Sequence, residues 1–190
     1  MTASGPRNPS ALVLLADGSE EIEAVTVIDI LRRAEIEVTA AGVTQRDITA
    51  SRGVRLMADA VLADVTDAPF DVVVLPGGAR GAETFRDSRA VQQLLERQHQ
   101  RGGRLAAICA APSALASAGL LRSRRATSYP GFLAEADAAQ LSEDPVVTDG
   151  LITTSRGPGT AMGFALALVT LLCGETRARD VAAKALAEYP

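Results

Sequence analysis

Five short apolar runs constrain the fold of this chain more than any other feature. They span residues 11–16, 36–41, 71–76, 104–108 and 151–155. They are largely continuous rather than alternating, which is typical of strands buried on both faces of a parallel sheet. Helical patterns lie between most of them. Strand alternating with helix predicts an α/β fold, with a mostly parallel sheet covered on both faces in a three-layer α/β/α sandwich.

The first helical pattern covers residues 19–33, with Ser19 as its expected N-cap. Its apolar stripe consists of Ala24, Val27, Ile28 and Leu31. Three further helices are predicted over residues 88–101, 160–173 and 178–189, the first of them behind Ser88. The segment 52–65 fits the alternation less well and is expected to contribute to an antiparallel pair.

The length of 190 residues suits one domain with a full core. Residues 1–10 are polar and rich in Ser, Pro and Gly, so we expect a flexible tail followed by a single domain over residues 11–190. Hydrophobic residues make up 47% of the chain but aromatic residues only 3%, so the core must consist of Ala, Val, Leu and Ile.

Charge and hydropathy exclude several classes of partner. The net charge is −4 and no basic patch is interleaved with aromatic residues, so nucleic acid is not expected as a partner. The longest apolar stretch, around residues 163–173, is shorter than the ~20 residues that cross a bilayer. The two cysteines, Cys109 and Cys173, are expected to be reduced thiols in a cytoplasmic protein.

Four of the predicted strands are followed by segments with functional character. These segments are "DGSEEIE", "PGGARGAE", the turn at Cys109, and "SRGPGT". Ligands of open α/β sheets bind beyond the carboxyl ends of the strands. If the sheet is parallel, the four segments share one edge and form a composite site.

Cys109 follows an apolar strand and precedes a helix that opens with Pro112. This is the elbow arrangement of a nucleophile, which needs small residues on both sides; Ala107 and Ala111 supply them. The positive end of the helix dipole is expected to favour the thiolate. The alternative is that Cys109 is a small core residue, which is how we interpret Cys173 at the end of an apolar helix.

Glu23 borders the inward stripe of its helix, so we expect a desolvated carboxyl group with a raised pKa that can donate a hydrogen bond to the sulfur. Gly77 and Gly78 let backbone N–H groups approach a ligand, and Gly78 and Ala110 are candidate oxyanion donors. A tight turn explains Gly77 equally well. Glu20 and Glu21 need no role beyond favourable placement in the first helical turn.

The "SRGPGT" segment opens a helix and offers Arg156 and backbone donors to an anion. Tyr129, Ser155 and Arg156 are expected to line the pocket. Arg156 could equally pair with an acidic loop. The single histidine, His99, lies in a polar helix end and is expected to be solvated. One histidine and two distant cysteines make no metal site, and "PGGARGAE" is not a nucleotide fingerprint, so no metal or cofactor is expected.

Together these motifs resemble the DJ-1/ThiJ/PfpI superfamily, closest to its DJ-1, or YajL-like, branch. The resemblance rests on residues 11–43, 71–83, 105–115 and 151–169 and extends from about residue 11 to 185. It implies a flavodoxin-like fold, a homodimer, Cys109 as reactive cysteine, and Glu23 as its protonated partner. It also implies oxidative-stress protection, oxidation of the cysteine to sulfinic acid, chaperone-like activity, and glyoxalase or deglycase activity on methylglyoxal and its adducts.

The chain departs from that resemblance at three positions. Many relatives have a histidine near the cysteine, where this chain has Tyr129, a poor base near pH 7. Protease-like members have histidine directly after the cysteine, where this chain has Ala110. A further cysteine of some relatives is Ala50 here, so oxidation should concentrate on Cys109.

Three functions remain open from the sequence. The first is an enzyme in which Cys109 attacks a small α-oxoaldehyde while Glu23 shuttles a proton. The second is a redox sensor or stress chaperone whose thiol reacts with oxidants. The third is a cysteine hydrolase or amidase, which needs a base that the chain does not offer.

Overall fold

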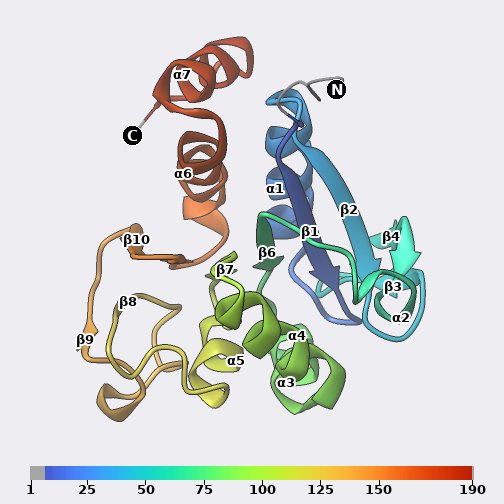
Figure 1. Ribbon diagram of the computed structural model, residues 1–190, viewed down its shortest axis with the longest axis vertical. Helices are drawn as coiled ribbons and strands as arrows, with labels where there is room; N and C mark the ends of the chain where they lie inside the picture. Colours follow the sequence, from blue (N-terminus) through green and yellow to red (C-terminus); the bar gives the residue numbers. More distant parts are fainter. Residues whose placement is uncertain (1–6, 190) are drawn as a thin grey trace, which may run out of the picture.

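A seven-stranded sheet forms the centre of the molecule, in the order β10–β11–β7–β6–β1–β2–β5 (Figure 1). The computed structural model describes residues 7–189. The strands are β1 (Ser10–Leu15), β2 (Glu37–Gly42), β5 (Ala60–Val61), β6 (Val72–Leu75), β7 (Arg104–Ile108), β10 (Val146–Asp149) and β11 (Ile152–Ser155). All neighbours in this sheet pair in parallel except β10, which is antiparallel to β11 at one edge.

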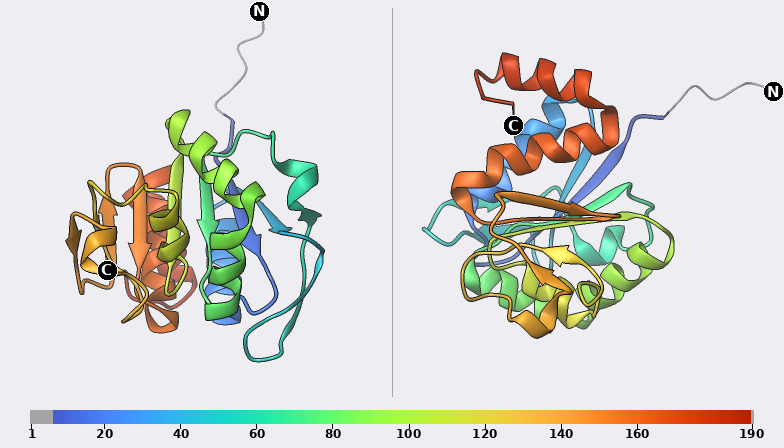
Figure 2. Two further views of the ribbon diagram at one scale, coloured as in Figure 1. Left: turned by 90° about the horizontal axis from the view of Figure 1, so that it is seen from below. Right: turned by 90° about the vertical axis from the view of Figure 1, so that its left-hand side faces the viewer.

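Helices cover both faces of this sheet. They are α1 (Glu21–Arg33), α2 (Leu62–Val65), α3 (Ala79–Asp87), α4 (Arg89–Gln100), α5 (Pro112–Ser117), α6 (Ala161–Cys173) and α7 (Glu175–Lys184), with 3-10 turns η1 (Glu135–Asp137) and η2 (Pro158–Thr160). Figure 2 shows α1 and α6 on one face and α3, α4 and α5 on the other, with α7 stacked outside α6. The predicted three-layer sandwich with a mostly parallel sheet is therefore confirmed.

The central strands are buried along their whole length, as their continuous apolar sequences predict. Every residue of β1 and of β6 is buried, because helices cover the sheet on each side. Phe85 of α3 and Phe164 of α6 are fully buried. Their two helices lie on opposite faces of the sheet (Figure 2). The remaining core is built almost entirely from Ala, Val, Leu and Ile, in agreement with the composition.

Two small sheets lie outside the central one. The hairpin pairs β3 (Asp47–Thr49) with β4 (Arg55–Met57) in antiparallel register, and β8 (Arg125–Ala126) pairs with β9 (Gln140–Leu141). The antiparallel pair expected from segment 52–65 therefore exists. Its first strand precedes that segment, and the end of the segment instead forms β5 and α2.

The ends of α1 and α7 differ from prediction. Ser19 does not cap α1: its Oγ accepts a hydrogen bond from the Ala16 N–H, 3.0 Å away, which closes the turn after β1. Glu20 is the N-cap instead, and its carboxylate accepts from the Glu23 N–H at 2.8 Å. α7 lies over Glu175–Lys184 rather than 178–189: it begins directly after Gly174, and it ends before Leu186, whose φ of 54° is left-handed.

The boundary expected at residue 10 falls close to the start of β1. Of the proposed tail, residues 1–6 lie outside the described residues. Ser10 already belongs to β1, and the Pro9 carbonyl accepts a hydrogen bond from the Glu37 N–H at 2.8 Å. The division into a flexible tail and a single domain stays a prediction.

Candidate active site

The carboxyl ends of the parallel strands open into a cavity of about 800 Å³. The loops after the central strands contribute Asp17, Gly18 and Glu20 (after β1), Gly78, Ala79 and Arg80 (after β6), Cys109 and Ala110 (after β7), and Pro158 (after β11). Thr49, Ala50, Ser51, Arg52, Tyr129 and Phe132 complete the wall. The four segments singled out in the sequence therefore meet at one edge, as a parallel sheet requires.

Cys109 occupies a sharp turn between β7 and α5, with φ of 64°. This left-handed conformation is uncommon for a residue with a side chain and marks a strained turn. Two backbone contacts hold it: the Cys109 N–H donates to the Ser155 carbonyl at 2.9 Å, and its own carbonyl accepts from the Tyr129 N–H at 2.8 Å. Ala107 and Ala111 are fully buried beside the turn. The predicted nucleophile elbow is present.

Glu23 reaches the same point from α1 and is completely buried. Its Oε2 atom accepts a hydrogen bond from the Gly77 N–H at 2.6 Å. Glycine is required at position 77, because a Cβ there would lie 2.5 Å from Cys109 Cβ and 2.7 Å from Glu23 Oε2. The missing side chain at this strand end thus lets the carboxyl group and the cysteine approach each other.

Burial raises the pKa of the Glu23 carboxyl from 4.5 to about 7, against the opposing hydrogen bonds of Gly77 and Cys109. Its Oε1 atom is buried and has no hydrogen-bond partner among residues 7–189. A full negative charge on this group would therefore be poorly solvated. The expectation of a raised pKa, and so of a protonated Glu23, agrees with this environment.

Burial and the negative charge of ionised Glu23 raise the pKa of the Cys109 thiol to about 12. The expected thiolate must therefore form against the desolvation of the sulfur, and it stays a prediction. The backbone N–H groups of Gly78 and Ala110 oppose this shift by hydrogen bonding to the sulfur. At neutral pH the pair can hold one negative charge but not two.

Two of the predicted pocket residues lie elsewhere. Tyr129 lines the cavity and is about half exposed. Ser155 is fully buried, and its Oγ donates to the Pro145 carbonyl at 2.7 Å, so it supports the elbow through its backbone only. The Arg156 guanidinium donates to the Glu143 carbonyl at 3.0 Å and does not line the cavity. The segment "SRGPGT" contributes Pro158 instead, because the chain turns into η2.

Several residues of the cavity wall were missed by sequence reasoning. Glu20 was interpreted only as a first-turn acid, yet it faces the cavity. Arg52 and Arg80 also line it. Arg52 arrives on the turn between β3 and β4, which α1 holds: the Arg52 N–H and the Ser51 hydroxyl donate to the Glu21 carboxylate at 2.8 and 2.7 Å. The contribution of Arg52 to the cavity wall depends on where the β3–β4 hairpin lies, which the sequence does not indicate.

The other residues considered for chemistry lie apart from the cavity. His99 lies near the end of α4, before the start of β7 and thus at the opposite edge of the sheet. The expectation of a solvated histidine is wrong, because His99 is half-buried and its Nδ1 has no hydrogen-bond partner among residues 7–189. Cys173 is the last residue of α6 and is a free thiol like Cys109. Among residues 7–189, no group of three or more His, Cys, Asp or Glu side chains could hold a metal ion. No helix in the same range is long and apolar enough to span a membrane.

The model of the DJ-1/PfpI family matches residues 9–171. The chain belongs to the DJ-1/PfpI family. Protein dj-1beta of Drosophila melanogaster is 43% identical over 183 residues, which cover 95% of this chain and 98% of that protein. The match to Protein DJ-1 homolog A of Arabidopsis thaliana, 42% identical over 176 residues, takes in 90% of this chain but only 45% of the plant protein.

Solved structures of the family have the same fold. The crystal structure of Drosophila melanogaster DJ-1beta superposes with a TM-score of 0.91 at 42% identity, over 96% of this chain and all of that one. Oxidised Toxoplasma gondii DJ-1 gives a TM-score of 0.92 at 40% identity, over 95% of this chain and 100% of its own. The DJ-1/PfpI fold is therefore shared over nearly the whole chain, while the roles of the individual site residues stay predictions.

The raised pKa of Glu23 predicts a pH-dependent stability. Between pH 4.5 and about 7 the unfolded chain releases the Glu23 proton while the folded protein retains it, so stability falls as pH rises through this window. Glu23→Gln lacks this titration. The free energy of unfolding of the wild type, relative to the variant, should decrease by about 3 kcal/mol across the window.

Urea denaturation at a series of pH values measures this difference. Glu83→Gln, which removes an exposed carboxyl group from α3, serves as the control and should track the wild type closely. A constant difference between wild type and Glu23→Gln would show that Glu23 titrates as an ordinary surface carboxyl group.

Proposed function

We propose that this DJ-1/PfpI protein converts small α-oxoaldehydes such as methylglyoxal to hydroxy acids, or removes their adducts, with Cys109 as nucleophile. The observation that carries this proposal is the buried pair of Glu23 and Cys109 beneath an open cavity. A relative named "Glutathione-independent glyoxalase DJR-1.2" of Caenorhabditis elegans supports it. That protein is 34% identical over 175 residues, which cover 90% of this chain and 93% of its own.

The pair can supply a nucleophile and an acid together. The sulfur receives two backbone N–H groups and has slight contact with the cavity, whereas Glu23 is fully buried with one N–H donor. We therefore assign the single negative charge of the reacting pair to the sulfur, although the pKa values of about 7 for Glu23 and about 12 for Cys109 favour ionised Glu23 in the resting protein. The remaining proton stays on Glu23, which becomes the acid of the reaction.

In the first step the Cys109 thiolate attacks the aldehyde carbon of methylglyoxal, and the π electrons of the C=O bond move to the aldehyde oxygen. Glu23 gives its proton to that oxygen, which yields a hemithioacetal. In this proposal the N–H groups of Gly78 and Ala110, which lie beside the sulfur, stabilise the developing negative charge.

In the second step the resulting Glu23 carboxylate removes the proton from the former aldehyde carbon and returns it to the neighbouring carbon. The hydroxyl proton of the hemithioacetal passes to the former ketone oxygen at the same time. The former aldehyde carbon is thus oxidised to a thioester and the ketone carbon is reduced to an alcohol, so no external electron acceptor is needed. Water then cleaves the thioester, and lactate leaves with regeneration of the thiolate. Methylglyoxal and one water molecule account for all atoms of the product.

Tyr129 affects the expected speed of this reaction. It stands at the mouth of the cavity where many relatives have histidine, and its hydroxyl is a poor base near neutral pH. Glu23 must then carry every proton transfer alone, and slow turnover is expected. The same lack of a base argues against a hydrolase, since the single histidine lies at the other edge of the sheet.

A second function, oxidation of Cys109 as a redox signal or a trigger for chaperone activity, is favoured by a separate observation. The buried Oε1 atom of Glu23 has no hydrogen-bond partner among the described residues. A protonated carboxyl group there could donate to an oxygen added to the adjacent sulfur and so stabilise a sulfinate. The partner would then be an oxidant rather than an aldehyde.

We also propose a homodimer in the cytoplasm. Four large apolar side chains stay exposed on α1 and on the hairpin that α1 holds: Ile22, Val25, Val54 and Met57, at 55%, 47%, 48% and 63%. Pairing with a second copy would remove them from water. The two free thiols suit a reducing compartment.

Lactate production tests the enzymatic proposal. Purified wild type incubated with methylglyoxal should release lactate, and Cys109→Ala should show only the uncatalysed rate. Glu23→Gln should lower the rate by about a hundredfold or more, because the acid is lost. Cys173→Ala is the matched control and should retain full activity; equal slow conversion by all four proteins would contradict the proposal.

Peroxide treatment tests the redox proposal. Mass spectrometry of the intact protein and its peptides should find two added oxygen atoms on Cys109 and none on Cys173. Glu23→Gln should shift the product distribution between sulfenate and sulfinate, because a neutral amide replaces the proton donor. Equal oxidation of both cysteines would oppose a dedicated switch.

The oligomeric state tests the dimer. Light scattering coupled to gel filtration should give twice the mass of 19.7 kDa for the wild type and about half of that value for Val25→Glu. Leu186→Glu, at a residue that is 95% exposed elsewhere, should stay dimeric. A monomeric wild type would contradict the proposed dimer. A dimeric Val25→Glu would show that the dimer interface lies on another surface.

A further inference from the structure

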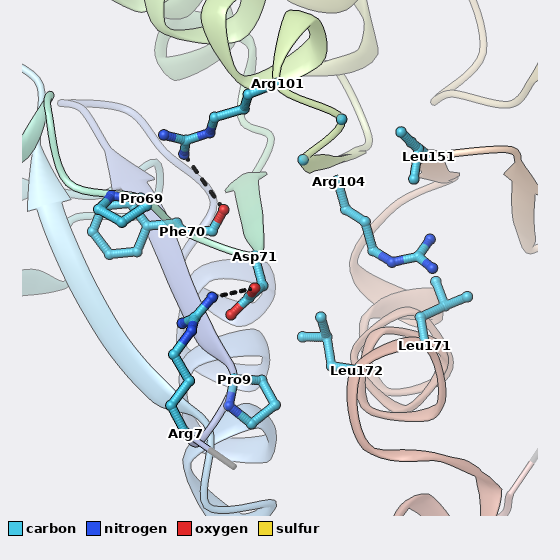
Figure 3. A pocket seen from close by; sticks show the side chains of 12 residues that line it. Arg7, Pro9, Pro69, Phe70, Asp71, Arg101, Arg104, Leu151, Leu171 and Leu172 are labelled. Atoms are coloured by element: carbon cyan, nitrogen blue, oxygen red, sulfur yellow. Dashed lines mark hydrogen bonds and ion pairs between the residues drawn. The ribbon is translucent and has the colours of Figure 1, made fainter. Parts of the chain in front are cut away.

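A second cavity, of about 530 Å³, lies at the amino edge of the sheet, opposite the Cys109 site. Its walls come from the start of β1, the residues before β6, the turn between α4 and β7, and the end of α6 (Figure 3). We propose that this cavity binds a small monocarboxylate with an aliphatic body, with Arg104 holding the carboxylate. This inference is independent of the reaction at Cys109.

The charge of the cavity favours an anion. Three arginines line it, Arg7, Arg101 and Arg104, in a chain whose net charge is −4. Among the described lining residues the carboxylate is Asp71. It already accepts hydrogen bonds from the Ser10 N–H at 2.8 Å and from Arg7 at 2.7 Å. These donors lower the pKa of Asp71 against the effect of its burial, so it remains ionised and paired with Arg7.

Arg104 is the cation available to a ligand. Its guanidinium makes one long contact with the protein, from Nη1 to the Gly150 carbonyl at 3.5 Å, and no carboxylate of residues 7–189 forms an ion pair with it. The guanidinium extends toward Leu171, away from Arg101 (Figure 3). A planar guanidinium with most of its N–H groups unused is suited to a carboxylate.

The surroundings of Arg104 supply an apolar wall. Leu151, Leu171 and Leu172 line the cavity beside it and are all partly exposed. Apolar side chains next to a cation select a ligand that combines a charge with a hydrocarbon body. Arg101 forms no ion pair among residues 7–189 either, but its guanidinium donates to the Ala68 and Phe70 carbonyls and to Gln98. Arg104 is therefore the guanidinium open to a ligand, and a monocarboxylate matches its single charge.

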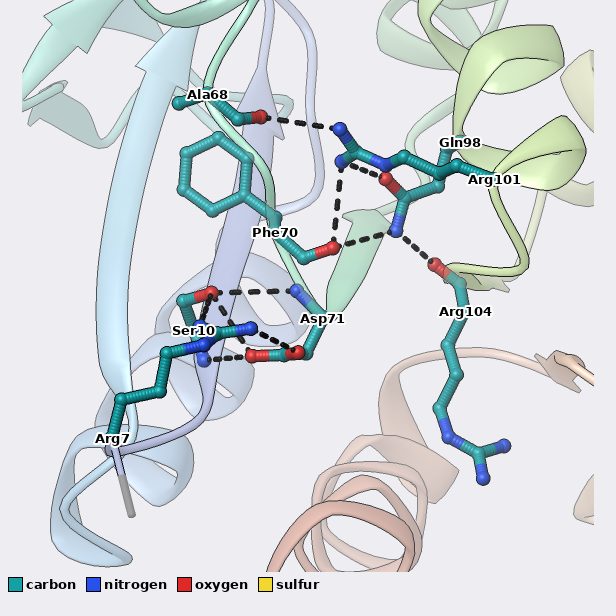
Figure 4. A network of polar contacts seen from close by, with 8 residues as sticks. All are labelled: Arg7, Ser10, Ala68, Phe70, Asp71, Gln98, Arg101 and Arg104. Carbon is teal, nitrogen blue, oxygen red and sulfur yellow. Dashed lines mark hydrogen bonds and ion pairs between the residues drawn. The ribbon is translucent and has the colours of Figure 1, made fainter. Parts of the chain in front are cut away.

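A buried network fixes the walls in place (Figure 4). Gln98 is completely buried, and its Nε2 donates to the Phe70 carbonyl at 3.0 Å and the Arg104 carbonyl at 3.1 Å. Its Oε1 accepts from Arg101. Gly103 must lack a side chain, because a Cβ there would lie 2.3 Å from Gln98 Nε2. The cavity is therefore held by internal bonds before any ligand arrives.

The last carbonyl groups of α4 are hydrogen-bonded within the chain. The Arg97 carbonyl accepts a hydrogen bond from the N–H of residue 101, the Gln98 carbonyl from residue 103, and the His99 carbonyl from residue 102. These three carbonyl groups therefore have partners within the chain. The chain's own first six residues, "MTASGP", contain no carboxylate side chain that could neutralise Arg104. An external anion can therefore occupy the position beside Arg104.

Amide chemical shifts test the proposal, with octanoate as probe. Octanoate should shift the amides of Gly102, Gly103 and Leu151 in a saturable way. Acetate, which lacks the tail, and octylamine, which reverses the charge, should bind at least about tenfold more weakly. Arg104→Gln should weaken octanoate binding by about tenfold or more, the usual effect of losing a charged hydrogen-bond partner.

Two further variants distinguish binding in this cavity from nonspecific binding of octanoate to the protein. Arg89→Gln removes an exposed arginine at the far end of α4 and should leave octanoate binding unchanged. Leu172→Ser should abolish the preference for octanoate over acetate even where folding is intact. Unsaturable shifts, equal binding of octylamine, or unchanged binding by Arg104→Gln would each overturn the proposal, whatever the activity of Cys109.

Discussion

The contact between Glu23, Gly77 and Cys109 is the constraint on which the rest of this site depends. A carboxyl group from α1, a bare backbone from the end of β6 and a cysteine from the end of β7 converge where a single Cβ would clash. Removing the carboxyl group from water keeps its proton near neutral pH. A sulfur next to it can then be ionised only while that proton stays in place.

The fold explains how such a contact survives. The parallel strands β1, β6 and β7 are neighbours in the sheet, so their carboxyl ends bring the three segments together without long loops. The left-handed turn at Cys109 is tied down on both sides, by β11 through the Ser155 carbonyl and by the Tyr129 N–H. A packed core on each face of the sheet supports this local strain.

Much of this arrangement could be predicted from the sequence because it depends on local patterns. Continuous apolar runs revealed the buried strands, and small residues around Cys109 revealed the elbow. Contacts made by loops could not be derived in this way. Arg156 follows a strand end as expected, but its direction depends on the turn into η2, which carries it to Glu143. Arg52 enters the cavity only because Glu21 holds the hairpin.

The protonation of the thiol was also beyond a sequence argument. The helix dipole could be anticipated, whereas the desolvation of Cys109 and the charge of Glu23 depend on packing. The amino-edge cavity is a similar case, because its arginines and leucines come from four separate segments. In both places the chemistry arises from residues whose proximity is created by the tertiary fold.

The ultraviolet absorbance of the thiolate, followed against pH, tests the central claim most directly. The difference between Cys173→Ala and the double variant Cys109→Ser, Cys173→Ala isolates Cys109 from Cys173 and the tyrosines. The account places the first negative charge of the pair on the sulfur, so it predicts that thiolate absorbance is present already near neutral pH. Absorbance that rises only near the ordinary thiol value of 9.0 or above would contradict the account.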